Sequence, residues 1–109
     1  MSQTQILMSS PEYFKVEYSI NPWMVSGTQI DLELAKHQWE NLKSTIENAG
    51  AEVKVVPPNE NYPDLVFTAN SGIISKNDVL IANFRFEERR GEEELYSKWF
   101  KDNGYNVSR

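Results

Sequence analysis

Cysteine is absent from the 109-residue sequence, and histidine occurs once, as His37. The absence of cysteine excludes disulfides, thiolate metal sites and a cysteine nucleophile within these residues. A single histidine leaves too few ligands for a multi-histidine centre, so we expect no metal and no cofactor. The formal net charge of −5 argues against a nucleic-acid partner, because phosphate backbones are bound by basic surfaces.

Long hydrophobic runs are also missing. The longest are far shorter than the roughly 20 residues that span a bilayer, so we expect no membrane partner. The first residues do not follow the pattern of an export signal, and we therefore expect a cytoplasmic location. Hydrophobic residues make up 39% and charged residues 25%, which is typical of a globular protein. The length allows one core, and we expect residues 1–109 to form a single domain.

The first half of the sequence predicts a strand, a loop and a helix in that order. The apolar run at residues 6–8, closed by Pro11, is typical of a short buried strand. Residues 12–24 are rich in aromatic side chains but lack a helical period, which indicates an ordered loop. Apolar side chains recur at helical spacing over residues 29–49, and Thr28 is the expected N-cap.

A glycine follows each of two predicted helices. Gly50 ends the first, and the β-branched residues 52–56 predict a strand behind it. The second predicted helix, residues 92–103, opens with three glutamates and ends at Gly104. Residues 105–107 then begin another strand near the end of the sequence. The recurrence indicates a repeat architecture of which this chain is a fragment.

The middle of the sequence predicts further strands. Residues 64–68 have the composition of a strand, and residues 72–74 and 79–82 predict a β-hairpin around a polar turn. Residues 84–91 are rich in charge and predict a loop before the second helix.

Polar residues that could bind a ligand stand at the predicted ends of these elements. Asp64 and Asn70 are six residues apart, a spacing that places both on one face of a strand. Arg89 offers a planar fork of donors that suits a carboxylate. The residue types also allow simpler interpretations, in which Asp64 and Asn70 are turn residues and Arg89 is a solvated ion-pair partner.

The remaining candidates have structural interpretations. His37 falls on the first predicted helix, where it is expected at the boundary of the core. The three tryptophans, Trp23, Trp39 and Trp99, are expected to be core residues because of their large apolar rings.

Three motifs resemble the guanidine-modifying, or pentein, superfamily. They are ILMSSP with VEYSINPWM (residues 6–11 and 16–24), YPDLVFTANSG (62–72), and the stretch from FR to RRGEE (84–93). Their order and gaps are similar to those of the arginine dihydrolase and amidinotransferase-like branch, which is related to dimethylarginine dimethylaminohydrolase and arginine deiminase. The resemblance covers essentially the whole sequence.

The resemblance implies an α/β fold, a partial pentein propeller with about two of the five repeated β-β-α-β units. It also implies a hydrolase that acts on the guanidino carbon of arginine or a related amidino compound. In that superfamily a cysteine attacks the carbon and a histidine is the general acid/base, and neither motif is present in these residues. The chain alone is therefore expected to lack catalytic residues.

The resemblance assigns substrate binding to four positions. Asn21 and Asn70 are expected to face the substrate, Arg89 to bind its carboxylate, and Asp64 to accompany them. Relatives of the deiminase and dimethylargininase types carry aspartate in place of Asn70, whereas the dihydrolase branch has asparagine, which favours arginine as the substrate.

The chain could also have a different role. It could be a non-catalytic domain that binds arginine-like ligands. It could also be an interaction domain whose open sheet edges favour self-association or pairing with a complementary C-terminal chain.

Overall fold

The computed structural model describes residues 4–109, which divide into two compact units. The first unit ends at Val66 and the second spans Phe67–Arg109. Each unit has its own strands, its own long helix and its own small core. The single domain expected over residues 1–109 stays a prediction.

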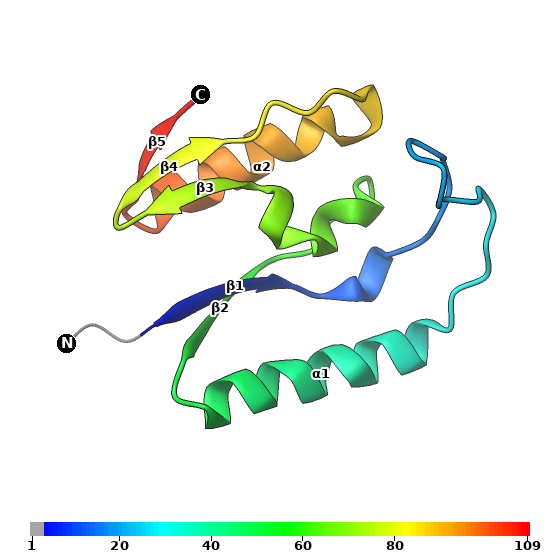
Figure 1. The fold of residues 1–109 in the computed structure, drawn as a ribbon, viewed down its shortest axis with the longest axis horizontal. Helices are drawn as coiled ribbons and strands as arrows, with labels where there is room; N and C mark the ends of the chain where they lie inside the picture. The colour runs from blue at the N-terminus through cyan, green and yellow to red at the C-terminus, as the bar shows by residue number, and fades with distance from the viewer. Residues whose placement is uncertain (1–3) are drawn as a thin grey trace. The chain divides into compact units, whose positions relative to one another are not determined.

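The first unit is a β-α-β arrangement (Figure 1). Strand β1 (Gln5–Ser9) pairs in parallel with β2 (Glu52–Val56), and the helix α1 (Leu32–Asn48) connects them and contacts β2. Parallel strands require a crossover of this kind, because a tight turn can join only antiparallel neighbours. The predictions of both strands are confirmed. The buried apolar side chains of this unit are Met8, Val56 and Leu65.

Helix α1 begins later than the sequence predicted. Asp31 is its N-cap, and the Asp31 carboxylate accepts a hydrogen bond from the backbone nitrogen of Leu34 at 3.0 Å. Thr28 was the wrong choice, because its hydroxyl donates to the carbonyl of Val25 and closes the preceding turn. The predicted end is confirmed, with Gly50 in the left-handed region at φ 101°.

The segment between β1 and α1 is an ordered loop, as predicted. It opens with a short 3-10 helix, η1 (Pro11–Tyr13), and its two arms are joined where Val16 bridges Thr28. The expectation that Trp23 is a core residue was wrong. Trp23 lies in a tight turn of this loop, and 86% of it is exposed.

The second unit is a β-β-α-β arrangement (Figure 1). Strands β3 (Gly72–Ser75) and β4 (Asp78–Ile81) form an antiparallel hairpin. Helix α2 (Glu87–Asp102) leads to β5 (Asn106–Ser108), which pairs in parallel with β4. The predicted hairpin and final strand are confirmed. Its buried apolar side chains are Val79, Ile81, Tyr96 and Phe100.

The prediction of a strand at residues 64–68 was wrong. This stretch forms two 3-10 helices, η2 (Pro63–Val66) and η3 (Thr68–Asn70). Short-range hydrogen bonds replace a strand ladder: the Asn70 nitrogen donates to the Phe67 carbonyl at 3.0 Å. The common strand face expected for Asp64 and Asn70 therefore does not exist.

Helix α2 begins five residues before its predicted start. Residues expected in a charged loop form its first turns, and they bind the segment that precedes them. The Arg90 guanidinium donates to the carbonyl of Arg85 at 2.7 Å, and the Glu93 carboxylate accepts from the backbone nitrogen of Phe84 at 2.9 Å. The predicted end at Gly104 is confirmed by its φ of 87°.

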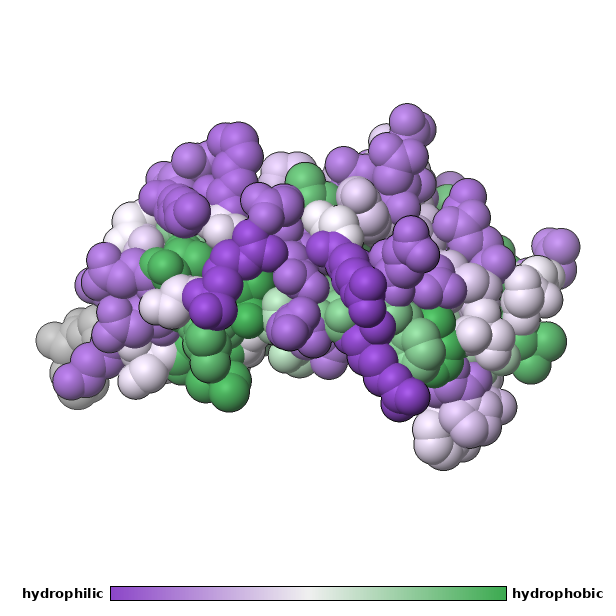
Figure 2. Space-filling model, turned by 90° about the horizontal axis from the view of Figure 1, so that it is seen from above, coloured by the Kyte–Doolittle hydropathy of each residue, from purple (hydrophilic) through white to green (hydrophobic). Residues whose placement is uncertain are grey.

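Neither long helix of the described residues is both long and apolar enough to cross a bilayer. Figure 2 shows hydrophobic atoms at the surface among hydrophilic ones. The largest exposed apolar side chains on regular elements are Leu34, Leu42, Ile73 and Leu80. Ile73 and Leu80 are opposite each other in the β3–β4 register, so they form one apolar pair on the outer face of the hairpin.

Candidate functional site

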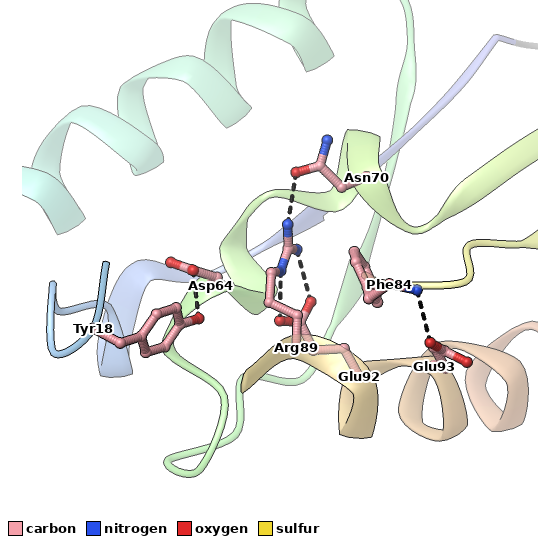
Figure 3. A network of polar contacts seen from close by, with 7 residues as sticks. All are labelled: Tyr18, Asp64, Asn70, Phe84, Arg89, Glu92 and Glu93. Carbon is pink, nitrogen blue, oxygen red and sulfur yellow. Dashed lines mark hydrogen bonds and ion pairs between the residues drawn. The ribbon is translucent and has the colours of Figure 1, made fainter. Parts of the chain in front are cut away.

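The four residues predicted to bind substrate divide between the two units. Asn21 and Asp64 belong to the first unit, and Asn70 and Arg89 belong to the second. Asp64, Asn70 and Arg89 are each held by side chains of their own unit (Figure 3), and Asn21 is held by backbone groups. The substrate-binding role of all four stays a prediction.

Arg89 is the centre of the polar cluster in the second unit. It lies in the first turn of α2 and is 8% exposed. Its Nε and Nη2 atoms donate to the two carboxylate oxygens of Glu92, each at 2.8 Å. Its guanidinium carbon lies 4.4 Å from the centroid of the Phe84 ring, a cation–π contact. Ion pair and ring together fix the plane of the guanidinium.

Glu92 is fully buried, which makes its pairing decisive for stability. A carboxylate removed from water is costly unless an opposite charge and hydrogen bonds compensate it. Arg89 supplies both, because residues three apart are neighbours on one side of a helix and the guanidinium fork matches the carboxylate. Arg89 is thus an ion-pair partner, as the simpler interpretation held, but a buried one rather than a solvated one.

Asn70 is the residue that the structure brings together with Arg89. It ends the 3-10 helix η3, and its Oδ1 atom accepts a hydrogen bond from Nη1 of Arg89 at 2.9 Å. The Asn70 side chain is otherwise exposed. It also borders an open hollow of about 510 Å³ whose other lining residues include Gly72, Ile73 and Leu80. The structure thus brings Asn70 and Arg89 together, and their role toward a substrate stays a prediction.

Asp64 is buried in the first unit and held by a tyrosine. It lies in η2, it is 5% exposed, and its carboxylate accepts a hydrogen bond from the Tyr18 hydroxyl at 2.5 Å (Figure 3). This bond fastens the loop between β1 and α1 to η2. Asp64 is therefore a buried, hydrogen-bonded residue and not the exposed turn residue that its position after Pro63 allows.

Asn21 occupies an exposed turn of the same loop. Its Oδ1 atom accepts hydrogen bonds from the backbone nitrogens of Trp23 and Met24, at 3.0 and 3.1 Å. This is an Asx turn, which explains why asparagine suits the position on structural grounds alone. Asn21 is exposed, and its side-chain oxygen is engaged within the turn.

Sequence reasoning missed three anchoring residues, two in the second unit and one in the first. Glu92 and Phe84 hold Arg89, and Tyr18 holds Asp64. The spacing of Arg89 and Glu92 is a helical signal, but the predicted helix began between them and concealed it. No sequence signal connects Tyr18 with Asp64, because they are 46 residues apart. His37, which received no catalytic role, is exposed on α1.

Tyr96 lies one turn beyond Glu92 on α2 and is fully buried. Burial raises the pKa of the Tyr96 phenol well above its usual range, and the Glu92 carboxylate raises it further, while Arg89 opposes the change. The phenol therefore stays neutral and contributes an apolar ring to the core behind the ion pair.

Comparison with protein families decides where the chain belongs. Residues 11–109 match the family model of the eukaryotic N,N dimethylarginine dimethylhydrolase. The chain belongs to this family. A protein of Mycobacterium tuberculosis, N(G),N(G)-dimethylarginine dimethylaminohydrolase, is 41% identical over 98 residues, which are 90% of this chain and 32% of that protein.

Other relatives include an uncharacterized protein and a bifunctional enzyme. An uncharacterized protein of Caenorhabditis elegans is 48% identical over 91% of this chain and 35% of its own length. The bifunctional arginine dihydrolase/ornithine cyclodeaminase ArgZ of Synechocystis is 40% identical over 94% of this chain and 15% of its own length. The chain thus spans about a third or less of these relatives.

Solved structures agree with this assignment. The N-terminal domain of ArgZ, solved with its product, matches with a TM-score of 0.89 and 37% identity over 98% of this chain and 39% of that one. A dimethylarginine dimethylaminohydrolase matches with a TM-score of 0.75 at 18% identity, a likeness of fold alone. The resemblance to the pentein superfamily is confirmed, and the α/β fold is a partial pentein fold.

Proposed function

We propose that the chain is the substrate-holding part of a hydrolase that acts on the guanidino carbon of arginine or a related amidino compound. The main support for this proposal is the structural match to the ArgZ N-terminal domain, which has been solved with its substrate and with its product. The cluster of Asn70, Arg89 and Glu92 supports it, because it is a fixed polar group within residues 11–109, which match the family model.

Hydrolysis of a guanidinium would need groups within these 109 residues and groups from outside them. A guanidinium is planar, delocalised and protonated at ordinary pH, so its carbon is a poor electrophile. Hydrolysis needs acceptors that hold the cation, a thiolate that attacks the carbon, and an acid that protonates the departing amine. Asn21, Asp64 and Asn70 are the proposed polar contacts, and Arg89 the proposed carboxylate contact. The cysteine and histidine would come from outside these residues, since the sequence has no cysteine.

Binding of L-arginine to the 109-residue chain tests the proposal by calorimetry. Agmatine has the same guanidinium but no carboxylate, and we expect it to bind more weakly than L-arginine. Asn70→Ala should weaken L-arginine binding, whereas Asn41→Ala, an exposed amide on α1, should leave it unchanged. Absence of binding by the wild-type chain would contradict the proposal.

An ammonia assay tests the division of the chemistry. The purified chain should release no ammonia from L-arginine, because it has no thiol nucleophile. Clear turnover would show that the thiolate mechanism is wrong for this chain.

The apolar pair on the β3–β4 hairpin favours the second candidate function, an interaction domain that pairs with another chain. Ile73 is 73% exposed and lies opposite the half-exposed Leu80. Sedimentation at rising concentration tests self-association: Ile73→Ser should abolish it, and Ser75→Ala on the same strand should not. A monomer at all concentrations would count against self-association.

A further inference from the structure

The hydrogen bonds around Arg89 form a series from Glu92 through Arg89 to Asn70. Glu92 accepts from Nε and Nη2 of Arg89, and Asn70 accepts from Nη1 (Figure 3). Glu92 has no solvent exposure and Arg89 has little, whereas Asn70 is exposed. The buried carboxylate is therefore connected to the surface amide through a single guanidinium.

A guanidinium can only donate hydrogen bonds, and this fixes the amide of Asn70. The Oδ1 atom must face Arg89, because the reversed amide would place its N–H groups against the N–H groups of the guanidinium. The Nδ2 group then points away from Arg89, as Figure 3 shows. Asn70 thus offers a donor, and it can hydrogen-bond an acceptor atom of a ligand.

We propose that Glu92 is a positioning residue of this site, which acts through Arg89 to hold the Asn70 amide with its NH₂ group outward. Without the Glu92 carboxylate, Arg89 would be a buried charge with its main partner removed, and its guanidinium would turn toward water. Asn70 would then lose the donor that fixes its oxygen. The ligand-binding consequence rests on the proposed function, whereas the orientation of the amide does not.

Nitrogen-15 NMR of the 109-residue chain tests the orientation. In the wild type, the Nε–H of Arg89 should exchange slowly with water, and nitrogen-15 relaxation should show the side-chain amide of Asn70 to be more rigid than the exposed Asn41 amide. Glu92→Gln keeps the shape but cannot accept at both positions. We expect it to accelerate exchange at Arg89 about tenfold and to shift the Asn70 amide toward the Asn41 values. Glu88→Gln, a change at an exposed glutamate of the same helix, should leave both signals unchanged.

Two results would overturn the proposal. One is a wild-type Asn70 amide that is already as mobile as that of Asn41, an outcome that needs no variant to fold. The other is an unchanged Asn70 amide in a folded variant at position 92. Glu92→Asp provides a second such variant: it retains the charge but not the full reach, and we expect it to restore part of the slow exchange.

Calorimetry with L-arginine separates this proposal from the proposed function. If the wild-type chain binds, Glu92→Gln should weaken binding about tenfold, the loss expected for one charge-assisted hydrogen bond, and Glu88→Gln should not. If wild-type chain does not bind while the NMR coupling holds, the proposed function fails and the positioning role stands. If Glu92→Gln binds as well as wild type with unchanged Asn70 signals, the positioning role fails.

Discussion

The hydroxyl of Tyr18 donates a hydrogen bond of 2.5 Å to the buried carboxylate of Asp64, across 46 residues of sequence. Tyr18 lies in the loop between β1 and α1, and Asp64 lies in η2. The bond is thus a direct connection between the loop that contains Asn21 and the core of the first unit.

Tyr18→Phe should loosen this loop and reduce stability. The variant removes one hydrogen-bond partner from a buried carboxylate, which costs about 1–3 kcal/mol. Urea unfolding measures the loss, and limited proteolysis should cut within residues 16–28 faster than in the wild type. The exposed Tyr13 provides the control, since Tyr13→Phe should change neither measurement. Equal cleavage in Tyr18→Phe and the wild type would show that the bond does not hold the loop.

Gly72 should tolerate no side chain. A Cβ at this position would lie 2.3 Å from the backbone oxygen of Leu80, which no rotamer can relieve. We expect Gly72→Ala to separate β3 from β4 and to lower the free energy of unfolding by about 2–4 kcal/mol. Ser75→Ala at the other end of β3 should have little effect. A Gly72→Ala chain with wild-type stability would contradict this account of the hairpin.

The two candidate caps of α1 can be compared directly. Asp31→Ala removes the acceptor for the Leu34 nitrogen and should cost about 1 kcal/mol, with a loss of helical circular dichroism. Thr28→Ala removes a turn hydrogen bond outside the helix and should leave the helical signal unchanged. A larger loss of helix in Thr28→Ala would restore the prediction made from the sequence.

Tyr96 should make the chain less stable in alkali. Burial, with the Glu92 carboxylate, raises the pKa of the folded phenol above the value of about 10 expected when unfolded. The unfolded chain therefore loses its proton first. Stability is fully present below pH 10 and falls above it by up to about 1.4 kcal/mol per pH unit.

Urea unfolding between pH 8 and pH 11 measures this slope. Tyr96→Phe should flatten the alkaline decline, because phenylalanine does not titrate. Tyr13→Phe should keep the wild-type slope, since Tyr13 is exposed. An equal decline in Tyr96→Phe would show that other groups cause the alkaline loss.

The regular elements were predictable where local signals agree. β-branched runs identified β2 and the β3–β4 hairpin, and the glycines after both helices marked their ends. Helix starts were less certain, because they depend on hydrogen bonds between the helix and the preceding segment. At α2 those bonds come from Arg90 and Glu93, and the sequence alone does not show their partners.

The residues of the site were predicted better than their surroundings. Motif resemblance selected Asn70 and Arg89, which the structure joins at 2.9 Å. It gave no account of Glu92, because the burial of a charge depends on packing around it. The strand predicted at residues 64–68 was wrong. Its β-prone apolar residues suggested a strand, but local turn hydrogen bonds around Pro63 determined the structure.

The salt bridge between Arg89 and Glu92 also bears on which ligands this unit would tolerate. If Arg89 had no counterion, it would repel a ligand guanidinium about 4 Å away. The repulsion would be about 4 kcal/mol at an effective dielectric constant of about 20. Glu92 cancels that field within the protein. The second unit therefore holds Arg89 beside Asn70 as one half of a neutral ion pair rather than as an isolated positive charge.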